Sequence, residues 1–177
     1  MTITREEILR ICSGVYRKNL DSFVRDFNRW AAEFGVTTPL RAAHFIGQVL
    51  HESGCLRYTE EIASGQAYEW RQDLGNVYKG DGVKFKGRGY LQITGRANYQ
   101  AYARSKWCVG DLMSHPEWLA KSPGNLKASL WFWWKSGLNT LADRDDSKAV
   151  TRKINGGLNG YAQRVDWTNK AKRSFLS

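Results

Sequence analysis

The chain has 177 residues, which suits one domain with a hydrophobic core of its own. Its 42% hydrophobic and 25% charged residues are the mixture of an ordinary globular protein, and the absence of a long apolar run excludes a membrane-spanning helix. The formal net charge of +10 predicts an anionic partner: a nucleic acid, an anionic membrane or an anionic wall polymer. Eight Trp residues favour stacking on ring-shaped ligands, although most large aromatic side chains fill cores.

The three cysteines, Cys12, Cys55 and Cys108, are too few for a disulfide framework, and one of them must stay unpaired in a monomer. Such usage is typical of a chain that folds in a reducing cytosol. Residues 1–9 contain several charged side chains, so we expect no secretory signal there. If the substrate lies outside the cytosol, another agent must deliver the protein.

Most of the chain shows the apolar periodicity of helices. The clearest helix is expected over residues 39–53, where five apolar residues fall on one face: Ala42, Phe45, Ile46, Val49 and Leu50. Thr37 or Thr38 is expected to cap its start, and Gly54 to end it. The segment INGG, residues 154–157, predicts the C-cap of a later helix. The other predicted helices cover residues 4–12, 20–34, 96–104, 123–136, 146–154 and 161–174.

Residues 64–89 differ from the rest of the chain, because they contain six glycines and no sustained periodicity. So long an irregular stretch in a compact domain is typical of a functional loop. Short strands are expected at most around residues 85–94. No repeat, low-complexity tract or linker divides the sequence, so we expect a single domain over residues 1–177.

Glu52 is the most informative residue. It extends the apolar stripe of its helix, three positions after Val49 and seven after Phe45. A carboxyl group at the end of such a stripe is partly desolvated, which raises its pKa and leaves a proton available for a glycosidic leaving oxygen. From position alone, a Glu that pairs with a Lys or Arg near a helix end is an equally good interpretation.

Glu60 and Glu61 follow in the next loop and offer a second carboxylate. A carboxylate opposite the first one could activate water, as an inverting glycosidase requires. Adjacent glutamates are, however, more often part of a solvated surface.

The densest motif is FKGRGYLQITGR, residues 85–96. Glycines on both sides of Arg88 let the backbone pass close to another segment or a ligand. Gln92 and Thr94 would share one face of a short strand and present an amide and a hydroxyl to a sugar or a water. Thr94 could instead cap the next helix. Lys86 and Arg88 could bind phosphate, but no nucleic-acid-binding signature surrounds them.

No metal site is expected. HESGC, residues 51–55, begins like the zinc motif HExxH, but its fifth residue is Cys55 and Gly54 would break the helix that aligns the ligands. His44 and His51 lack a convincing third ligand.

Four segments, in this order, resemble glycoside hydrolase family 19: AHFIGQVLHESG, FKGRGYLQITGRANY, WFWWKSGLNTLAD and INGGLNG. The match runs from about Thr37 to Arg173 and is more similar to the lysozyme-like endolysins of bacteriophages than to plant chitinases. The resemblance implies a mainly α, lysozyme-like domain with two helical lobes around a substrate cleft and at most a small β element. It also implies one catalytic domain without a separate wall-binding module, and hydrolysis by single displacement with inversion.

The resemblance also implies roles for individual residues. The HES motif places the general acid at Glu52, and the second carboxylate, nine positions later, falls on Glu61. Because Ile62 follows where Asn is common, a shift of the base to Glu60 stays open. The hydroxyl that helps to hold the attacking water falls on Thr94. The implied substrate-binding residues are Gln92, Asn98, Tyr99, Asn155 and Arg164.

We therefore expect a phage endolysin, a muramidase that hydrolyses β-1,4 bonds of peptidoglycan and lyses the host cell. A chitinase of the same family is the alternative, and a non-catalytic wall-binding module and a nucleic-acid-binding protein are alternatives from other classes. The expected partners are peptidoglycan glycan strands and, by charge, the anionic cell envelope; no nucleic acid and no cofactor are expected. The protein is expected to be a monomer, made in the host cytoplasm without a signal peptide, that reaches the wall through a separate membrane pore.

Overall fold

The computed structural model describes residues 1–176, and the chain there is built from helices and turns. The helices are α1 (Arg5–Ile11), α2 (Arg17–Trp30), α3 (Pro39–Glu52), α4 (Asp81–Lys84), α5 (Arg96–Ala103), α6 (Gly124–Lys135), α7 (Leu138–Asp143), α8 (Ser147–Asn155) and α9 (Tyr161–Phe175). Two compact units divide the chain: the first contains residues 1–57 and the chain from Leu130 onward, and the second contains residues 58–129. Within the described residues, no helix has both the length and the apolar character that crossing a membrane requires.

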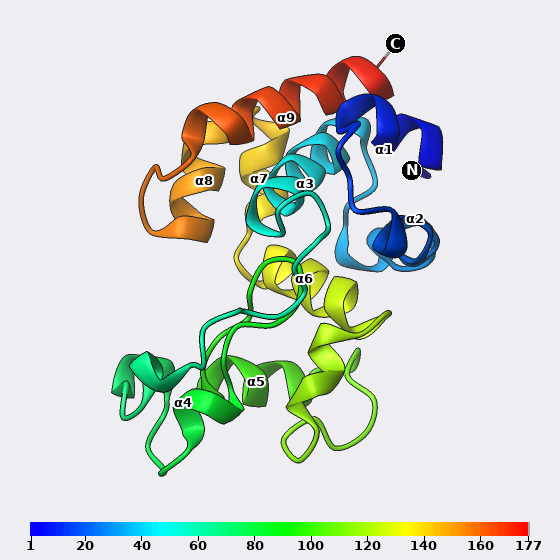
Figure 1. Ribbon diagram of the computed structural model, residues 1–177. Helices are drawn as coiled ribbons and strands as arrows, with labels where there is room; N and C mark the ends of the chain where they lie inside the picture. The colour runs from blue at the N-terminus through cyan, green and yellow to red at the C-terminus, as the bar shows by residue number, and fades with distance from the viewer. Residues whose placement is uncertain (177) are drawn as a thin grey trace. The chain divides into compact units, whose positions relative to one another are not determined.

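Helix α3 is the centre of the first unit, and α9 packs along it (Figure 1). Every residue of α3 from Ala42 to Leu50 is buried. Gly47 allows the two helices to approach closely, because a Cβ atom at this position would lie 2.2 Å from Thr168 Oγ1 on α9. The last two residues of α3, His51 and Glu52, are half-buried.

Aromatic side chains fill the core of the first unit. The rings of Phe27 and Phe45 lie 6.1 Å apart, and Trp133 meets Phe45 edge-on at 5.4 Å. The indole N–H of Trp133 donates to Asn139 Oδ1 at 2.8 Å, so this buried polar atom is satisfied. The five apolar residues that predict the inner face of α3 are all in this core.

The caps that the sequence predicts are present. Thr38 caps α3, and its hydroxyl accepts a hydrogen bond from the Arg41 N–H at 3.2 Å. Gly156 is the C-cap of α8 with a left-handed φ of +75°, which confirms the interpretation of INGG as a helix end. All the predicted helices are present. The helix predicted over residues 20–34 begins earlier, at Arg17, and finishes in a 3-10 turn over Ala31–Phe34. The short helix α7 was not predicted.

The second unit contains the glycine-rich segment, which is less irregular than predicted. It includes 3-10 turns at Gln66–Tyr68 and Gln72–Leu74, and helix α4. The short strands expected around residues 85–94 do not form. In the described part of the chain, only isolated bridges join Arg88 to Glu60 and to Ile93, because left-handed residues at Gly89 (φ +81°) and Gln92 (φ +54°) fold the chain back in a tight turn.

A buried ion pair fixes the glycine-rich segment. Asp81 is 2% exposed and accepts hydrogen bonds from Arg96 Nε at 2.8 Å and Nη2 at 2.6 Å. Its Oδ2 also accepts from the backbone N–H groups of Val77 and Tyr78, each at 3.0 Å. These donors, the Arg96 guanidinium first, hold the pKa of Asp81 below its usual range. The segment is therefore a fixed scaffold for the residues on either side of it.

Candidate active site

Glu52 is the last residue of α3, and an unusual turn fixes the end of this helix. Residues 54–56 all have left-handed backbones, with φ of +55°, +58° and +65°. This conformation costs free energy at residues that carry a Cβ atom. The Ser53 hydroxyl supports the turn, because it donates to the Val49 carbonyl at 2.6 Å and accepts from the Leu56 N–H at 2.8 Å.

A buried arginine holds the Glu52 carboxylate. Arg164, on α9, is 1% exposed, and its Nη2 donates to Glu52 Oε1 at 2.5 Å. Its Nη1 donates to Gln48 Oε1 at 2.6 Å, and its Nε donates to the Asn159 carbonyl at 3.0 Å. The Glu52 side chain keeps 20% of its surface exposed. We refer to Gln48, Glu52 and Arg164 as the Glu52 cluster.

These contacts bear on two expectations. Glu52 ends the buried stripe of α3, as predicted, and it also pairs with a buried guanidinium, which is the alternative that its position near a helix end left open. Arg164 is too deeply buried to bind substrate directly, because its donors face Glu52, Gln48 and a backbone carbonyl. The structure makes Arg164 a residue that positions Glu52.

His51 lies beside the Glu52 cluster and explains one glycine of the INGGLNG motif. A Cβ atom at Gly160 would lie 2.1 Å from His51 Cε1, and Gly160 has a left-handed φ of +69°. The His51 Nδ1 atom lies 2.7 Å from Gln163 Oε1. Burial and, after it, the positive charge of Arg164 lower the pKa of His51, which favours the neutral ring.

Asn155, at the end of α8, is half-buried. Within residues 1–176 its Oδ1 atom is buried without a hydrogen-bond partner. Its role in substrate binding stays a prediction.

In the second unit, hydrogen bonds fix both carboxylate oxygens of Glu61. The Tyr68 hydroxyl donates to Oε1 at 2.9 Å, and the Gly87 N–H donates to Oε2 at 3.2 Å. The Glu61 N–H in turn donates to the Gly87 carbonyl at 2.9 Å. Burial and the hydrogen bond to Glu61 raise the pKa of Tyr68, so this hydroxyl stays protonated as a donor.

Three polar side chains converge beside Gly87. A Cβ atom at this position would lie 2.6 Å from Gln92 Oε1, 3.2 Å from Thr94 Oγ1 and 3.3 Å from Glu61 Oε2. These three oxygens therefore lie close together against the Gly87 backbone, at an approach that only glycine permits. Such an arrangement can accept and orient the protons of a water molecule. We refer to Glu61, Tyr68, Gly87, Gln92 and Thr94 as the Glu61 cluster.

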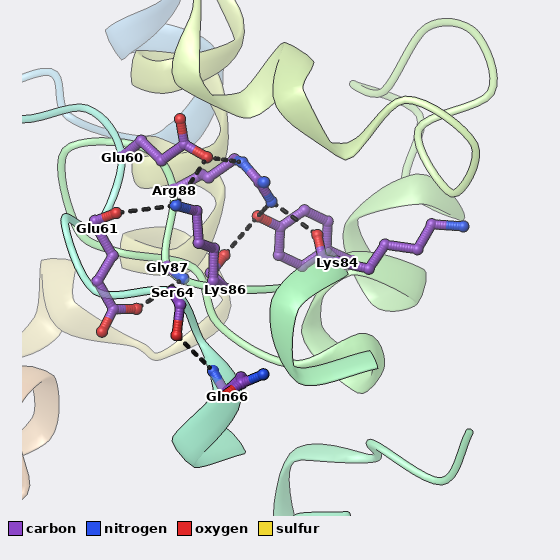
Figure 2. Close-up of polar contacts among 9 residues, drawn as sticks. Glu60, Glu61, Ser64, Gln66, Lys84, Lys86, Gly87 and Arg88 are labelled. Carbon is purple, nitrogen blue, oxygen red and sulfur yellow. Dashed lines mark hydrogen bonds and ion pairs between the residues drawn. The ribbon is translucent and has the colours of Figure 1, made fainter. Parts of the chain in front are cut away.

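Glu60 has a different environment (Figure 2). Its Oε1 accepts a hydrogen bond from Arg88 Nε at 3.0 Å and lies 3.4 Å from Lys86 Nζ. The Lys86 Nζ also donates to the Glu61 backbone carbonyl at 3.1 Å. Arg88 is 6% exposed, so Glu60 neutralises a buried guanidinium. The geometry favours Glu61 over Glu60 as the carboxylate next to Gln92 and Thr94.

The other residues predicted in and after this motif donate hydrogen bonds to backbone carbonyls of the motif. Thr94 does not cap α5, because Gly95 is the N-cap without a side-chain hydrogen bond; the Thr94 hydroxyl donates to the Gln92 carbonyl at 2.9 Å. Asn98 Nδ2 donates to the Thr94 carbonyl at 2.9 Å. Tyr99 is fully buried, and its hydroxyl donates to the Lys86 carbonyl at 2.8 Å. The predicted substrate contact of Tyr99 is therefore corrected to a structural contact.

The sequence did not single out Tyr68 or Gln48 as members of the clusters, whereas the predicted close approach of the backbone beside Arg88 is confirmed at Gly87. Gln48 sits on α3 one helical turn before Glu52, so i, i+4 spacing could have indicated that the two side chains share a partner. Tyr68 lies in the irregular segment, where no period predicts which side chain turns toward Glu61.

No protein-family model matches the chain. A Haemophilus influenzae protein named "Glycosyl hydrolase family 19 domain-containing protein" is 40% identical over 108 residues, which are 59% of this chain and 49% of that protein. An endochitinase of Arabidopsis thaliana is 32% identical over 145 residues, 81% of this chain and 48% of the relative. The chain thus spans about half the length of these curated relatives.

Solved structures show the same fold. Chitinase C from Streptomyces griseus HUT6037 superposes with a TM-score of 0.71 at 20% identity, over 99% of this chain and 93% of that one. A family GH19, class IV chitinase from Zea mays gives a TM-score of 0.65 at 24% identity, over 99% and 82%. These likenesses confirm the predicted mainly α, lysozyme-like fold. The finer resemblance to bacteriophage endolysins stays a prediction.

Proposed function

Because the chain belongs to glycoside hydrolase family 19, we propose that it hydrolyses β-1,4 bonds of an N-acetylglucosamine polymer, with Glu52 as general acid and Glu61 as general base. Chitin is the leading substrate class, since relatives and structural neighbours are named endochitinase or chitinase. The chain matches about half the length of the named relatives, so its own site residues must carry the argument.

Glu52 is suited to the acid role by its fixed position and partial exposure. The buried Arg164 guanidinium holds one carboxylate oxygen, while the side chain keeps 20% of its surface exposed. In the proposed reaction, Glu52 transfers a proton to the glycosidic oxygen as the bond from that oxygen to C1 breaks. The leaving sugar departs with a free hydroxyl group, and Glu52 is left as a carboxylate.

Glu61 is suited to the base role because both its oxygens are oriented and one lies beside Gly87 with the oxygens of Gln92 and Thr94. A water bound at these oxygens would donate one proton to Glu61 and the other to Gln92 or Thr94. Glu61 takes a proton from this water as its oxygen bonds to C1, and the configuration at C1 inverts. Glu61 then returns the proton to solvent, and Glu52 regains one.

The observation that carries the proposal is the convergence of three side-chain oxygens on Gly87. A carboxylate on a solvated surface has no reason to lie so close to an amide and a hydroxyl. Glu60, the neighbouring carboxylate, has no part in this convergence, since it pairs with Arg88 and Lys86. The contrast favours a water-activating role for Glu61 over a general surface role for both glutamates.

The substrate class is tested by giving the protein two polymers, a soluble chitin hexasaccharide and purified peptidoglycan. Liquid chromatography with mass spectrometry of the products identifies the new reducing-end sugar and hence the bond that is cut. We expect cleavage of the hexasaccharide into shorter chitin oligosaccharides, and loss of this cleavage in Glu52→Gln. Binding to either polymer without cleavage would instead support a non-catalytic wall-binding module.

Peptidoglycan is the second candidate substrate, and the net charge of +10 favours it. Chitin is uncharged, whereas bacterial envelopes are anionic and attract basic proteins. On this alternative the protein is an endolysin that lyses the host cell after release through a separate membrane pore. New reducing ends of N-acetylmuramic acid in peptidoglycan digests, produced at a higher rate than chitin cleavage and suppressed by salt, would establish it.

A further inference from the structure

A cavity in the second unit lies apart from both carboxylate clusters. Its volume of about 360 Å³ is within the range of cavities that hold small ligands. The end of α5, the 3-10 turn Pro116–Ala120, the start of α6 and the segments between them form its walls. We refer to it as the Trp118 pocket, and its apolar lining includes Trp107, Val109, Leu112, Trp118, Leu119 and Pro123.

The wall around Trp118 is fixed by contacts within the protein. The Trp118 ring stacks on the ring of His115, with centroids 4.8 Å apart and an interplanar angle of 14°. Two glycines fit closely against the same residue. A Cβ atom at Gly110 would lie 2.6 Å from Trp118 Cζ3, and one at Gly124 would lie 2.3 Å from the Trp118 carbonyl oxygen. Because Trp118 is held in this way and is nevertheless 38% exposed, it offers an aromatic surface to a bound molecule.

The charged residues of the pocket lining have one sign. Lys121 and Lys127 both line the pocket, and none of its described lining residues is Asp or Glu. Lys127 is only 8% exposed, so its ammonium group attracts an anion more strongly than a fully solvated lysine does. Burial raises the pKa values of the Cys108 thiol and the Tyr102 hydroxyl, so neither group adds a negative charge at neutral pH.

We propose that the Trp118 pocket binds a small amphiphilic anion, a molecule with a flat apolar ring system and one carboxylate, sulfonate or phosphate group. The ring system packs against Trp118 and the apolar side chains beside it, and the anionic group meets Lys121 and Lys127. This chemistry complements an apolar lining whose charged members are both cationic. No described lining residue belongs to the Glu52 cluster or the Glu61 cluster, so binding in this pocket is separate from the proposed hydrolysis.

Anilinonaphthalene sulfonate is the probe for the test, because it combines an aromatic body with one sulfonate and its fluorescence rises at apolar sites. Titration of the folded full-length chain should show one site with a Kd on the order of 10–100 μM. Phenylnaphthylamine, which lacks the sulfonate, should bind at least about tenfold more weakly. In two-dimensional NMR spectra, the probe should shift the indole signals of Trp107 and Trp118 and leave that of Trp30, on α2, unchanged.

Substitutions of lysine by methionine test the contribution of charge, because methionine has an unbranched side chain without charge. Lys127→Met should weaken binding of the sulfonate at least about tenfold. Lys121→Met should weaken it about 2–5-fold, since Lys121 is exposed. Lys153→Met is the matched control, because Lys153 is an exposed lysine on α8, and its affinity should be unchanged. The Tm of each variant shows whether it is folded, and Lys121→Met keeps the test decisive if Lys127→Met does not fold.

Three results would overturn the proposal. The first is no saturable binding of the sulfonate by the folded chain. The second is equal or tighter binding of the uncharged naphthylamine, or binding of the sulfonate that Lys121→Met does not weaken, because the lysines would then have no part in recognition. The third is a shift of other indole signals without those of Trp107 and Trp118, because the probe would then bind elsewhere on the chain.

Discussion

The Glu52 cluster and the Glu61 cluster hold their carboxylates in different ways. Glu52 ends a buried helix, and one buried guanidinium from a second helix fixes its side chain. Glu61 lies on an irregular stretch, where a tyrosine hydroxyl and a backbone N–H fix its two oxygens. The position of Glu52 is therefore set by its helix, whereas the position of Glu61 is set by separate hydrogen bonds from two different residues.

This difference has consequences for what each cluster tolerates. The hydrogen bonds of α3 and the packing of Gly47 against Thr168 hold the backbone around Glu52. We therefore expect a small substitution near Glu52 to leave its carboxylate in place. The Glu61 cluster depends on the absence of a side chain at Gly87. We therefore expect the Glu52 cluster to lose its function when a charged group is removed. We expect the Glu61 cluster to lose its function even when one methyl group is added.

The largest effect is expected for Glu52→Gln. The amide cannot transfer a proton, and general acid catalysis typically contributes about 10²–10⁴-fold to the rate. Because Gln can still accept a hydrogen bond from Arg164 but no longer neutralises it, we expect some loss of stability, on the order of 1–3 kcal/mol. Rates on the chitin hexasaccharide should be measured about 10 °C below the Tm of the variant. Near-normal hydrolysis by the folded variant would remove Glu52 from the mechanism.

Glu61→Gln and Glu60→Gln should separate activity from stability. We expect Glu61→Gln to lower the hydrolysis rate by at least about 10²-fold with a small change in Tm. Glu60→Gln should change the rate by less than about tenfold, because Glu60 faces Arg88 and Lys86 and not the oxygens beside Gly87. It should instead lower the Tm, since Arg88 is buried. The reverse pattern would make Glu60 the base.

Gly87→Ala tests the convergence directly. The added methyl group would meet Gln92 Oε1 at 2.6 Å, and it would displace this oxygen from the set that we assign to the attacking water. Because a flexible side chain can move away, the fold should survive, while activity falls by roughly 10²-fold. Gly14→Ala is the matched control, since nothing lies within 4 Å of a Cβ atom there. Equal activity of the two variants would contradict the water site.

The smallest effect concerns the pH dependence of stability in the second unit. Asp81 has a lowered pKa in the folded chain, chiefly through its hydrogen bonds to Arg96. Its contribution to stability is complete above the ordinary pKa of an unfolded Asp, about 3.9, and is lost as the pH falls through the lower folded value. Asp81→Asn should reduce this acid loss and lower stability at neutral pH by about 1–3 kcal/mol. Urea unfolding between about pH 2 and pH 7 gives both quantities, and an unchanged acid slope in Asp81→Asn would assign it to other groups.

The same comparison shows how far the sequence could predict this protein. The helix of Glu52 was predictable because its apolar residues repeat at helical spacing and Thr38 is a preferred N-cap. The motif around residues 85–96 was predictable as a site, but the geometry was not. Gln92 and Thr94 meet beside Gly87 through a left-handed turn, whereas the alternation of residues suggested a strand.

Partners at long range were also beyond the sequence. Nothing in the pattern around Arg164 indicates that it turns inward to Glu52 and Gln48, or that Tyr99 is covered on every side. Amphipathic periodicity predicts which face of a helix is buried, but it does not predict which polar side chain on that face will have a buried partner. Such contacts depend on packing between elements that are distant in sequence.

The central claim is hydrolysis by an acid and a base with inversion at C1, and the anomer released first tests it most directly. Proton NMR of the chitin hexasaccharide during the first minutes of digestion, before mutarotation, distinguishes the two anomers at the new reducing end. The account predicts that the α-anomer appears first. The β-anomer appearing first would mean retention, and the roles assigned to Glu61, Gln92 and Thr94 would then be wrong.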